Sequence, residues 1–496
     1  MKTNKKANNL CKELGGKIGK NKVKDDEAIL VTYASDYSLA PFSKPGLVIL
    51  PESTQDVKEV LVVANREKVP VTVMSAGVNI GGLTVPSDGG IVLDFRNMDR
   101  ILEINTDSNY AVIEPGVIFD RFTAALNEKG FRCHLPTAPG GATPLGNYLL
   151  NPSGSLSNRH LDSIIDLEVV IPDGTILNTG SAAFPSDASK PNRRYGPFSD
   201  VAGLFCCGYG TLGVVTRASV RIYPKNESNR VNLTAFEDFG SAVRFVQDVV
   251  GNNIPESCII WSWQFYKTYD ISFPSFANPS IPAELFNDPR KPPEGIPYTV
   301  VTTFMSGYEE MMITAEKICK RIAEKYGGRA ISMDEMETIC PGAVPAWKQF
   351  YSEHHQPKME HNKKYGLGQY VSLLLDAAPD DVIEIEKWAL KEMLSFGATP
   401  VCYYAQPFDF GRYMMFRTFA YYDPEKEDLL KDISEKVKGL YQVAMSRYGA
   451  TPERYKPKTP VMLQQLGGYY HLLKLIKNAI DPNNILNPQL ELFKEE

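Results

Sequence analysis

The first hundred residues alternate short apolar runs with an amphipathic segment. Two runs, 47–50 and 71–74, are bounded by turn residues, which is typical of buried strands. Between them, residues 56–66 place apolar side chains on one helical face, preceded by Ser53 or Thr54 as a cap. A strand, a helix and a second strand within about 30 residues predict a small α/β subdomain.

The pattern changes twice further along the chain. From 91 to 224 it is strand-rich, with a helix at 118–129 and strands at 164–171 and 175–179 around the turn Pro172-Asp173-Gly174. After Lys225, helical and strand-like stretches alternate. Helices are expected at 234–250, 309–325, 379–394 and 425–448, and strands at 258–266, 298–305 and 412–422. Residues 1–40 predict a helix with a polar tail. Because 496 residues exceed one ordinary core, we expect at least two domains.

Three glycine-containing stretches follow predicted strands or turns. The first, 71–82, reads Val-Thr-Val-Met-Ser-Ala-Gly-Val-Asn-Ile-Gly-Gly, so an apolar strand runs into a loop that can turn tightly. Backbone amides of such a loop can converge on an anion such as a diphosphate. The spacing matches neither the Rossmann fingerprint nor a Walker A loop, and an ordinary strand–turn–strand junction is the alternative. The other two stretches are 136–147 and 204–224, for which simple turn chemistry is the alternative.

The order of these stretches resembles the FAD-binding (PCMH-type) domain of the vanillyl-alcohol oxidase/p-cresol methylhydroxylase superfamily. The resemblance rests on residues 51–60, 71–82, 89–94, 98–102 and 114–117, on Gly-Thr-Leu-Gly-Val-Val-Thr at 210–216, and on Asp-Pro-Asn-Asn-Ile-Leu-Asn-Pro at 481–488. Gln489 stands where the superfamily usually has glycine. The resemblance implies an α+β fold with a two-subdomain FAD-binding domain at 1–225, whose core is about 42–225. It also implies an α+β cap (substrate) domain at 226–455 and a segment, 456–496, that returns to the FAD-binding domain.

The same resemblance implies which residues bind FAD. The first loop would hold the diphosphate, and the other two stretches would complete the site. The implied residues are Ser75, Ala76, Gly77, Val78, Asn79, Ile80, Gly81, Gly82, Pro139, Gly140, Gly141, Thr143, Gly146, Asn147, Gly210, Gly213, Val214 and Val215. Some relatives attach the flavin covalently through a histidine in the first loop, and others through a histidine or tyrosine in an Arg-x-x-His-His strand of the cap. Neither position has a histidine here, and Tyr413 is displaced, so we expect non-covalent FAD.

Composition excludes several other classes of protein. The net charge of −6 argues against a general nucleic-acid-binding surface. The lysine-rich N-terminus lacks an apolar h-region, and no apolar run reaches the length of a membrane span, so we expect no secretory signal and no membrane span. Eight cysteines without a Cys-x-x-Cys predict neither a disulfide scaffold nor a metal or iron–sulfur site. A cytoplasmic location fits these features best.

The catalytic residues are harder to predict. His354 and His355 lie close to His361 and could act as bases or metal ligands, although a solvated loop is the alternative. Arg412, Arg417, Arg454 and Tyr455 could bind a carboxylate or phenolate, although salt bridges within the cap are the alternative. Trp261, Trp263, Phe265 and Tyr266 alternate on the strand expected at 258–266, where they could line a pocket or pack in the core. The phenol-binding tyrosine and the catalytic aspartate of the phenol-oxidising relatives are absent, because Gly82 or Leu83 and Ala138 stand there.

These features predict an FAD-dependent oxidoreductase, a dehydrogenase or an oxidase. It would take a hydride from an alcohol, a phenolic or a 2-hydroxy-acid substrate to flavin N5. Electrons would then pass to a partner protein, a quinone or oxygen. One alternative is a non-catalytic or electron-relaying flavoprotein subunit of a larger redox complex, and another is a fold that binds a different nucleotide. The oxidoreductase and the relay subunit are both compatible with a homo-oligomer or with a redox partner subunit.

Overall fold

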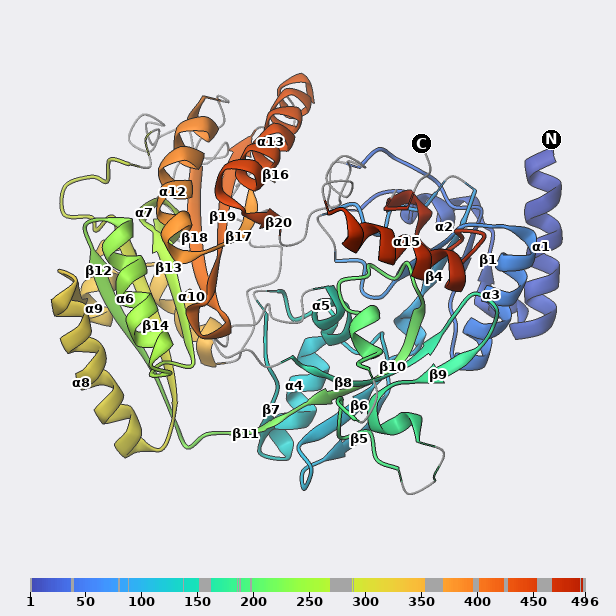
Figure 1. Cartoon of the computed structure of the whole chain (residues 1–496), viewed down its shortest axis with the longest axis horizontal. Coiled ribbons are helices and arrows are strands. Elements are labelled where there is room, and N and C mark those ends of the chain that lie inside the picture. The colour runs from blue at the N-terminus through green and yellow to red at the C-terminus, as the bar shows by residue number, and fades with distance from the viewer. Residues whose placement is uncertain are drawn as a thin grey trace.

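A computed structural model places the chain in two adjoining parts (Figure 1). The structure describes residues 2–36, 40–78, 81–87, 89–136, 138–150, 162–184, 186, 189–196, 199–267, 288, 290–352, 369–395, 401–422, 427–452, 466–490 and 492–493. The first part contains both chain ends and the strands up to β11 (Tyr223–Pro224). The second part contains the remaining strands, from β12 (Ser228–Phe236) onward.

The N-terminal subdomain is a four-stranded sheet with helices against it. Its strand order is β1 (Val23–Lys24), β2 (Leu47–Ile49), β4 (Ile91–Asp94) and β3 (Val71–Met74), with β2, β4 and β3 parallel. Helices α1 (Lys2–Ile18), α2 (Glu27–Thr32) and α3 (Thr54–Glu67) accompany it. The side chain of Ser53 caps α3 by accepting a hydrogen bond from the Asp56 amide (3.2 Å). The predicted strand–helix–strand unit is therefore present, and Ser53 is its cap.

The second subdomain is an antiparallel sheet of five strands. They lie in the order β5 (Ile101–Asn105), β6 (Tyr110–Ile113), β10 (Val214–Arg221), β8 (Ile164–Val170) and β9 (Ile176–Asn178). Helix α4 (Phe119–Glu128), the short helix α5 (Pro144–Leu150) and the pair β7 (Phe131–Arg132) and β11 complete it. Val170 and Val214 also pack into the core of the N-terminal subdomain, so the two sheets share apolar contacts.

The second part is built on one large antiparallel sheet, which we call the cap sheet. Its path is β15 (Arg329–Ile331), β12, β14 (Thr299–Gly307), β13 (Ser257–Ser262), β18 (Val401–Phe408), β19 (Tyr413–Tyr422), β17 (Leu374–Ala377) and β20 (Thr451–Pro452), and β16 (Gln369–Val371) also pairs with β19. Helices α6 (Phe239–Gly251), α8 (Glu309–Lys325), α12 (Pro379–Leu394) and α13 (Glu427–Tyr448) pack against one face. The smaller helices α7 (Trp263–Lys267), α9 (Met333–Ile339) and α10 (Ala343–Ser352) belong to the other side.

That other side joins the two parts of the molecule. Trp261, Tyr404 and Met415 from the cap sheet belong to the same hydrophobic cluster as Leu145 and Phe205 from the first part. A buried ion pair between Arg132 of β7 and Glu256, just before β13, also links the parts. The cap sheet therefore presents one face to its own helices and the opposite face to the first part of the molecule.

Two predicted elements of the second part need correction, and several of its strands were not predicted. The helix expected at 234–250 begins only at Phe239, because residues 228–236 pair with β14 as a strand. The strand expected at 258–266 ends at Ser262, so Trp263, Phe265 and Tyr266 lie on helix α7. Strands β15, β16, β17 and β18 were not predicted. Among the described residues, no helix has the length and hydrophobicity needed to cross a membrane.

Candidate functional site

The three glycine segments converge, although they are far apart in the sequence. We call them the first (75–82), second (139–147) and third (210–215) glycine segments. Ser75 Oγ and Thr143 Oγ1 share a hydrogen bond of 2.9 Å, which joins the first segment to the second. A Cβ atom at Gly146 would lie 2.8 Å from Thr143 Oγ1 and 3.1 Å from Ser75 Oγ. Glycine is therefore required where these two segments meet.

A segment near the C-terminus, residues 481–490, completes the convergence, and we call it the terminal segment. Asn487 accepts a hydrogen bond from the Val73 amide (3.0 Å) and donates one to the Tyr209 carbonyl (2.7 Å). Leu486 bridges to Val71 in parallel, as a further strand would. Gly210, at φ 68°, has no room for a side chain, because a Cβ atom would lie 2.7 Å from Asn487 Nδ2. Asn487 thus joins the strand before the first segment to the start of the third.

The described backbone around this convergence fits a diphosphate-containing cofactor. Gly77 and Gly82 adopt φ values of 69° and 72°, which favour glycine and allow a tight loop. No heavy atom lies within 4 Å of the Cβ position of Gly141, so its backbone faces open space. The side-chain oxygen Oε1 of Gln489 is buried and has no hydrogen-bond partner in the described part of the chain. Asn79 and Ile80 lie outside the described residues.

Other members of the predicted cofactor set have packing contacts. A Cβ atom at Gly140 would collide with the Asp120 carboxylate, and one at Gly213 would meet Val169 and Phe205. Val214 is buried in the first part, and Val215 packs at the edge of the cluster that joins the two parts. Asn147 donates to the Thr143 carbonyl (3.1 Å) within helix α5. These contacts hold the second and third segments in place.

Opposite these segments, the cap sheet presents polar side chains among aromatic ones. Alternation along each strand places Leu374, Asp376, Tyr404, Gln406, Met415 and Arg417 on the same face, which we call the site face. Arg417 lies directly across from Leu374 on one side and Tyr404 on the other. Its Nε donates to Ser372 Oγ (3.3 Å), and its guanidinium lies 4.6 Å from the centre of the Phe419 ring.

Aromatic rings surround Arg417 on the site face. Tyr404 stacks on Phe419 with ring centres 5.8 Å apart, and Trp261 and Phe265 lie 5.6 and 5.3 Å from Tyr404. Arg417 Nη1 reaches the Tyr404 hydroxyl at 3.5 Å. A guanidinium within an aromatic wall can bind a planar anion and also contact an apolar substrate body.

The site face and the third glycine segment belong to one hydrophobic cluster, which includes Met415 and Leu374 of the cap sheet and Leu212 and Val215 of the segment. Desolvation by the surrounding protein raises the pKa of the Cys207 thiol, and the negative charge of Asp376 raises it further. Cys207 lies three residues before Gly210 and adopts φ 56°, and its amide donates to the Leu149 carbonyl of α5 (2.7 Å). Asp376 lies directly across from Met415 in the sheet, so its carboxylate is on the face that meets this cluster.

The predicted catalytic residues separate into two groups. Arg412 lies on the turn between β18 and β19, and its side chain is 75% exposed and pairs with Asp409 at 2.9 Å. The adjacent Gly411 lies against Val250 of α6, so Arg412 belongs to the helix-covered side, and the structure does not bring it to the glycine segments. His354, His355, Arg454 and Tyr455 lie outside the described residues. Of the candidate arginines on the described chain, only Arg417 lies on the site face, beside the aromatic candidates Trp261 and Phe265.

Sequence reasoning missed Asp376, Tyr404 and Gln406. Their strands, β17 and β18, are short or nearly all apolar, so neither shows a clean alternation of apolar and polar residues. The Tyr-Tyr-Ala-Gln run at 403–406 places one tyrosine on each face, a signal that becomes readable only once the strand is known.

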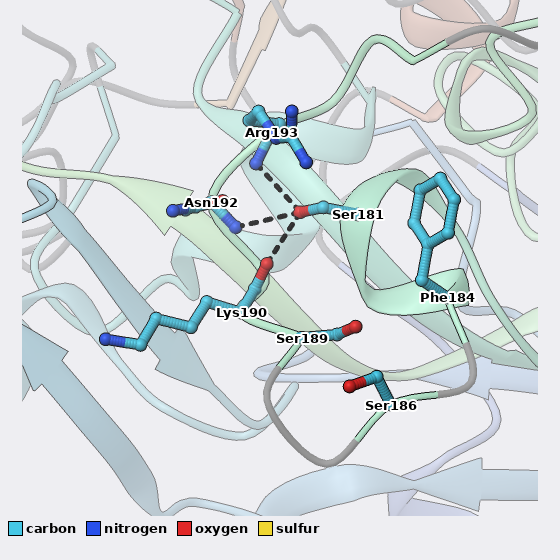
Figure 2. A pocket seen from close by; sticks show the side chains of 7 residues that line it. All are labelled: Ser181, Phe184, Ser186, Ser189, Lys190, Asn192 and Arg193. Atoms are coloured by element: carbon cyan, nitrogen blue, oxygen red, sulfur yellow. Dashed lines mark hydrogen bonds between the residues drawn. The ribbon is translucent and has the colours of Figure 1, made fainter.

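One depression in the described surface lies away from this site. It has a volume of about 430 Å³ and lies beside the segment that follows β9, lined by Ser181, Phe184, Ser186, Ser189, Lys190, Asn192 and Arg193. Figure 2 shows Ser181 at its centre, where the hydroxyl accepts from the Asn192 and Arg193 amides and donates to the Lys190 carbonyl. The Lys190 and Arg193 side chains point away from each other, so the depression does not gather its two cations around one point (Figure 2).

Comparisons with known proteins agree with this geometry. Residues 45–180 match the family model described as an FAD binding domain. The chain is 32% identical over 234 residues to glycolate oxidase subunit GlcD of Bacillus subtilis (strain 168), covering 46% of this chain and 48% of that protein. It is 31% identical over 181 residues to the mitochondrial D-lactate dehydrogenase [cytochrome] of Arabidopsis thaliana, covering 36% and 30%. The matched region thus spans about half or less of these relatives' length.

Two solved structures resemble the whole chain. The structure of p-cresol methylhydroxylase with substrate bound superposes with a TM-score of 0.84 at 19% identity, covering 98% of this chain and 97% of that one. The 4-ethylphenol oxidase of Gulosibacter chungangensis superposes with a TM-score of 0.81 at 19% identity, covering 97% and 96%. These likenesses establish the fold.

The chain therefore carries an FAD-binding domain, and its cofactor is FAD. Its overall architecture is that of p-cresol methylhydroxylase and 4-ethylphenol oxidase, which confirms the predicted resemblance and the α+β fold class. The described residues contain no cluster of histidine, cysteine and carboxylate side chains with the arrangement of a metal site.

Proposed function

We propose that this protein is an FAD-dependent oxidoreductase whose substrate binds between the glycine segments and the site face of the cap sheet. When bound, FAD supplies the acceptor for a hydride from the substrate carbon. The observation that carries the proposal is the hydrophobic cluster shared by the site face and the third glycine segment, because the site face also carries Asp376, a candidate acid/base group. The predicted cofactor residues are retained in this proposal.

The site face supplies the groups that this chemistry needs. Arg417 and the Tyr404 hydroxyl hold a negatively charged or hydroxyl group of the substrate, since guanidinium and phenol both donate hydrogen bonds. Asp376 removes the proton from the substrate hydroxyl, which is at the oxidised carbon in an alcohol or 2-hydroxy acid and on the ring in a para-alkylphenol. The aromatic side chains around Arg417 exclude water and contact the apolar part of the substrate. In this proposal Arg417 replaces Arg412 as the substrate-binding arginine.

The relatives' names support two of the three predicted substrate classes: 2-hydroxy acids such as glycolate and lactate, and para-alkylphenols. Alcohols are the third class, and the choice among them is left to experiment. We also propose that FAD is bound non-covalently, because the Tyr413 side chain packs against Phe408, with ring centres 5.5 Å apart. Flavin that stays with the acid-precipitated protein pellet would contradict non-covalent binding.

A second candidate function is an electron-relaying subunit of a larger complex. It is favoured by the name of one relative, which is a subunit of glycolate oxidase. In both candidates the reduced cofactor passes electrons to a partner protein, a quinone or oxygen. The two candidates differ in whether the isolated chain oxidises a small molecule.

The test is a comparison of Asp376→Asn with Asp432→Asn. Asp432 lies on the exposed face of α13 and pairs with Lys436 (2.6 Å), so its substitution controls for the loss of a carboxylate. FAD-loaded proteins are mixed without oxygen with a panel of 2-hydroxy acids, benzylic alcohols and para-alkylphenols, and flavin absorbance is followed. We expect Asp376→Asn to slow bleaching by about 10²- to 10⁴-fold, the usual contribution of a general base. Equal rates for both variants would remove Asp376 from the mechanism, and absence of bleaching in the unsubstituted protein would favour the relay subunit.

A further inference from the structure

Lys477 is a buried lysine that lies where the terminal segment meets the third glycine segment. It belongs to helix α15 (Gly468–Ile480), and its side chain is 1% exposed. Its Nζ donates to the Thr211 carbonyl at 2.8 Å and to Asp481 Oδ2 at 2.6 Å, and it reaches the Leu486 carbonyl at 3.5 Å. Thr211 lies inside the third glycine segment, and Leu486 lies inside the terminal segment. One ammonium group therefore binds both segments.

Asp481 continues the same network into the backbone. Its two carboxylate oxygens accept hydrogen bonds from the amides of Ile485 (3.0 Å) and Leu486 (2.9 Å). The carboxylate thereby folds the turn 481–486, after which Asn487 reaches Val73 and Tyr209. The network runs without a break from Lys477, through this turn, to the strand that precedes the first glycine segment.

A charged pair at this depth is costly to build. Burial lowers the pKa of Lys477, and the Asp481 charge raises it, so the ammonium depends on its partner. Replacing a buried ion pair by apolar side chains is often neutral or stabilising, so stability alone is a weak reason for a protein to keep one. The hydrogen bonds of Lys477 give a different reason. They are directional and join two backbone segments, so they fix the position of one segment relative to the other.

We propose that Lys477 is a positioning residue for the cofactor: it sets the distance between the third glycine segment and the terminal segment, and so controls the affinity for FAD. The proposal rests on the proposed FAD-binding residues and extends them to a residue that does not belong to any glycine segment. Lys477 acts through Thr211 and Leu486, whose carbonyls it binds. Loss of the ammonium shifts these segments against each other and weakens FAD binding.

The test is FAD titration of the full-length, flavin-free protein, together with its thermal midpoint with and without FAD. Lys477→Met removes the ammonium, and Lys474→Met is the matched control. Lys474 lies on the same helix one turn earlier, with its Nζ 5.6 Å from the centre of the Tyr470 ring. We expect the Kd for FAD to rise at least thirtyfold in Lys477→Met and to stay within twofold in Lys474→Met. We also expect Lys477→Arg, which keeps a charged donor, to recover part of the affinity.

Lys477→Met leaves Asp481 buried without its partner, so the titration is repeated on Lys477→Met/Asp481→Leu, in which neither charge remains. The proposal predicts a raised Kd in whichever of these proteins folds. An unchanged Kd with a lowered thermal midpoint would overturn it, because Lys477 would then serve stability alone. Failure of both proteins to fold would also overturn it, since the residue would then act in folding. If the unsubstituted protein binds no FAD, the proposed function fails instead.

Discussion

The FAD-binding part and the cap sheet place their functional residues in different ways. In the FAD-binding part, each glycine segment follows its own strand or turn, so local sequence determines its shape, as at Gly77 and Gly82. In the cap, Asp376, Arg417 and Tyr404 meet only because β17, β19 and β18 pair in a particular register. A shift of one residue in that register would turn each of these side chains to the helix-covered face.

The comparison explains what the sequence could and could not predict. The first glycine segment, the cap of α3 by Ser53 and helices α8 and α12 were predictable, because capping, turns and helical periodicity are local signals. The site face was not predictable, because its polar residues interrupt strands that read as apolar or irregular. Arg412 and Arg417 lie five positions apart on the same predicted strand. Only the structure reveals that Arg417 lies on the site face and Arg412 does not. The contacts of Lys477 with Thr211 also needed the fold, since 266 positions separate the two residues.

The largest effect is expected in the FAD-binding part, from Gly81→Asp. The carboxylate would compete with the diphosphate in the first glycine segment, and two like charges in a buried site cost several kcal/mol. We expect no FAD to remain bound after purification. The control is Gly16→Asp, because Gly16 is exposed on helix α1 and no heavy atom lies within 4 Å of its Cβ position. Normal flavin content, measured by absorbance, in Gly81→Asp would refute the assignment of the loop.

The next largest effect is on stability and concerns Asp166, a residue of the FAD-binding part whose role no local sequence pattern predicts. Burial raises its pKa from 3.8 to about 6, while Ser181, nearby backbone amides and the charge of Arg193 favour the carboxylate. Between these pKa values the unfolded chain releases a proton that the folded protein keeps, so stability falls as pH rises from about 4 to about 6. Asp166→Asn, which cannot ionise, should therefore be more stable than the unsubstituted protein above pH 6. A gain of about 1 to 3 kcal/mol is expected, allowing for partial screening by solvent.

The measurement for Asp166→Asn is urea unfolding at pH 4 and pH 8, with Asp173→Asn as the control. Asp173 lies in the exposed turn between β8 and β9, where its side chain accepts from the Thr175 amide. The difference between Asp166→Asn and the unsubstituted protein should be larger at pH 8 than at pH 4. An equal stability difference at pH 4 and pH 8 would mean that folding does not raise the pKa of the Asp166 carboxyl.

The smallest effect separates two arginines of the cap. Arg417→Leu should raise KM about 10- to 100-fold, because a hydrogen bond to a charged group contributes about 1.5–3 kcal/mol. Arg412→Leu should change KM by less than twofold, since Arg412 is exposed and pairs with Asp409. Steady-state kinetics with an artificial electron acceptor give both values. A reversed result, with the larger effect at Arg412, would mean that the cap sheet binds substrate on another face.

The most direct test of the account is one experiment on the unsubstituted protein: flavin-free protein is reconstituted with FAD and then mixed, without oxygen, with the substrate panel. The account predicts a flavin absorption spectrum after reconstitution and its bleaching by at least one 2-hydroxy acid, alcohol or para-alkylphenol. It also predicts that Arg417→Leu slows this bleaching at low substrate concentration. A protein that acquires no flavin spectrum, or whose flavin is bleached by dithionite and by no member of the panel, would contradict it.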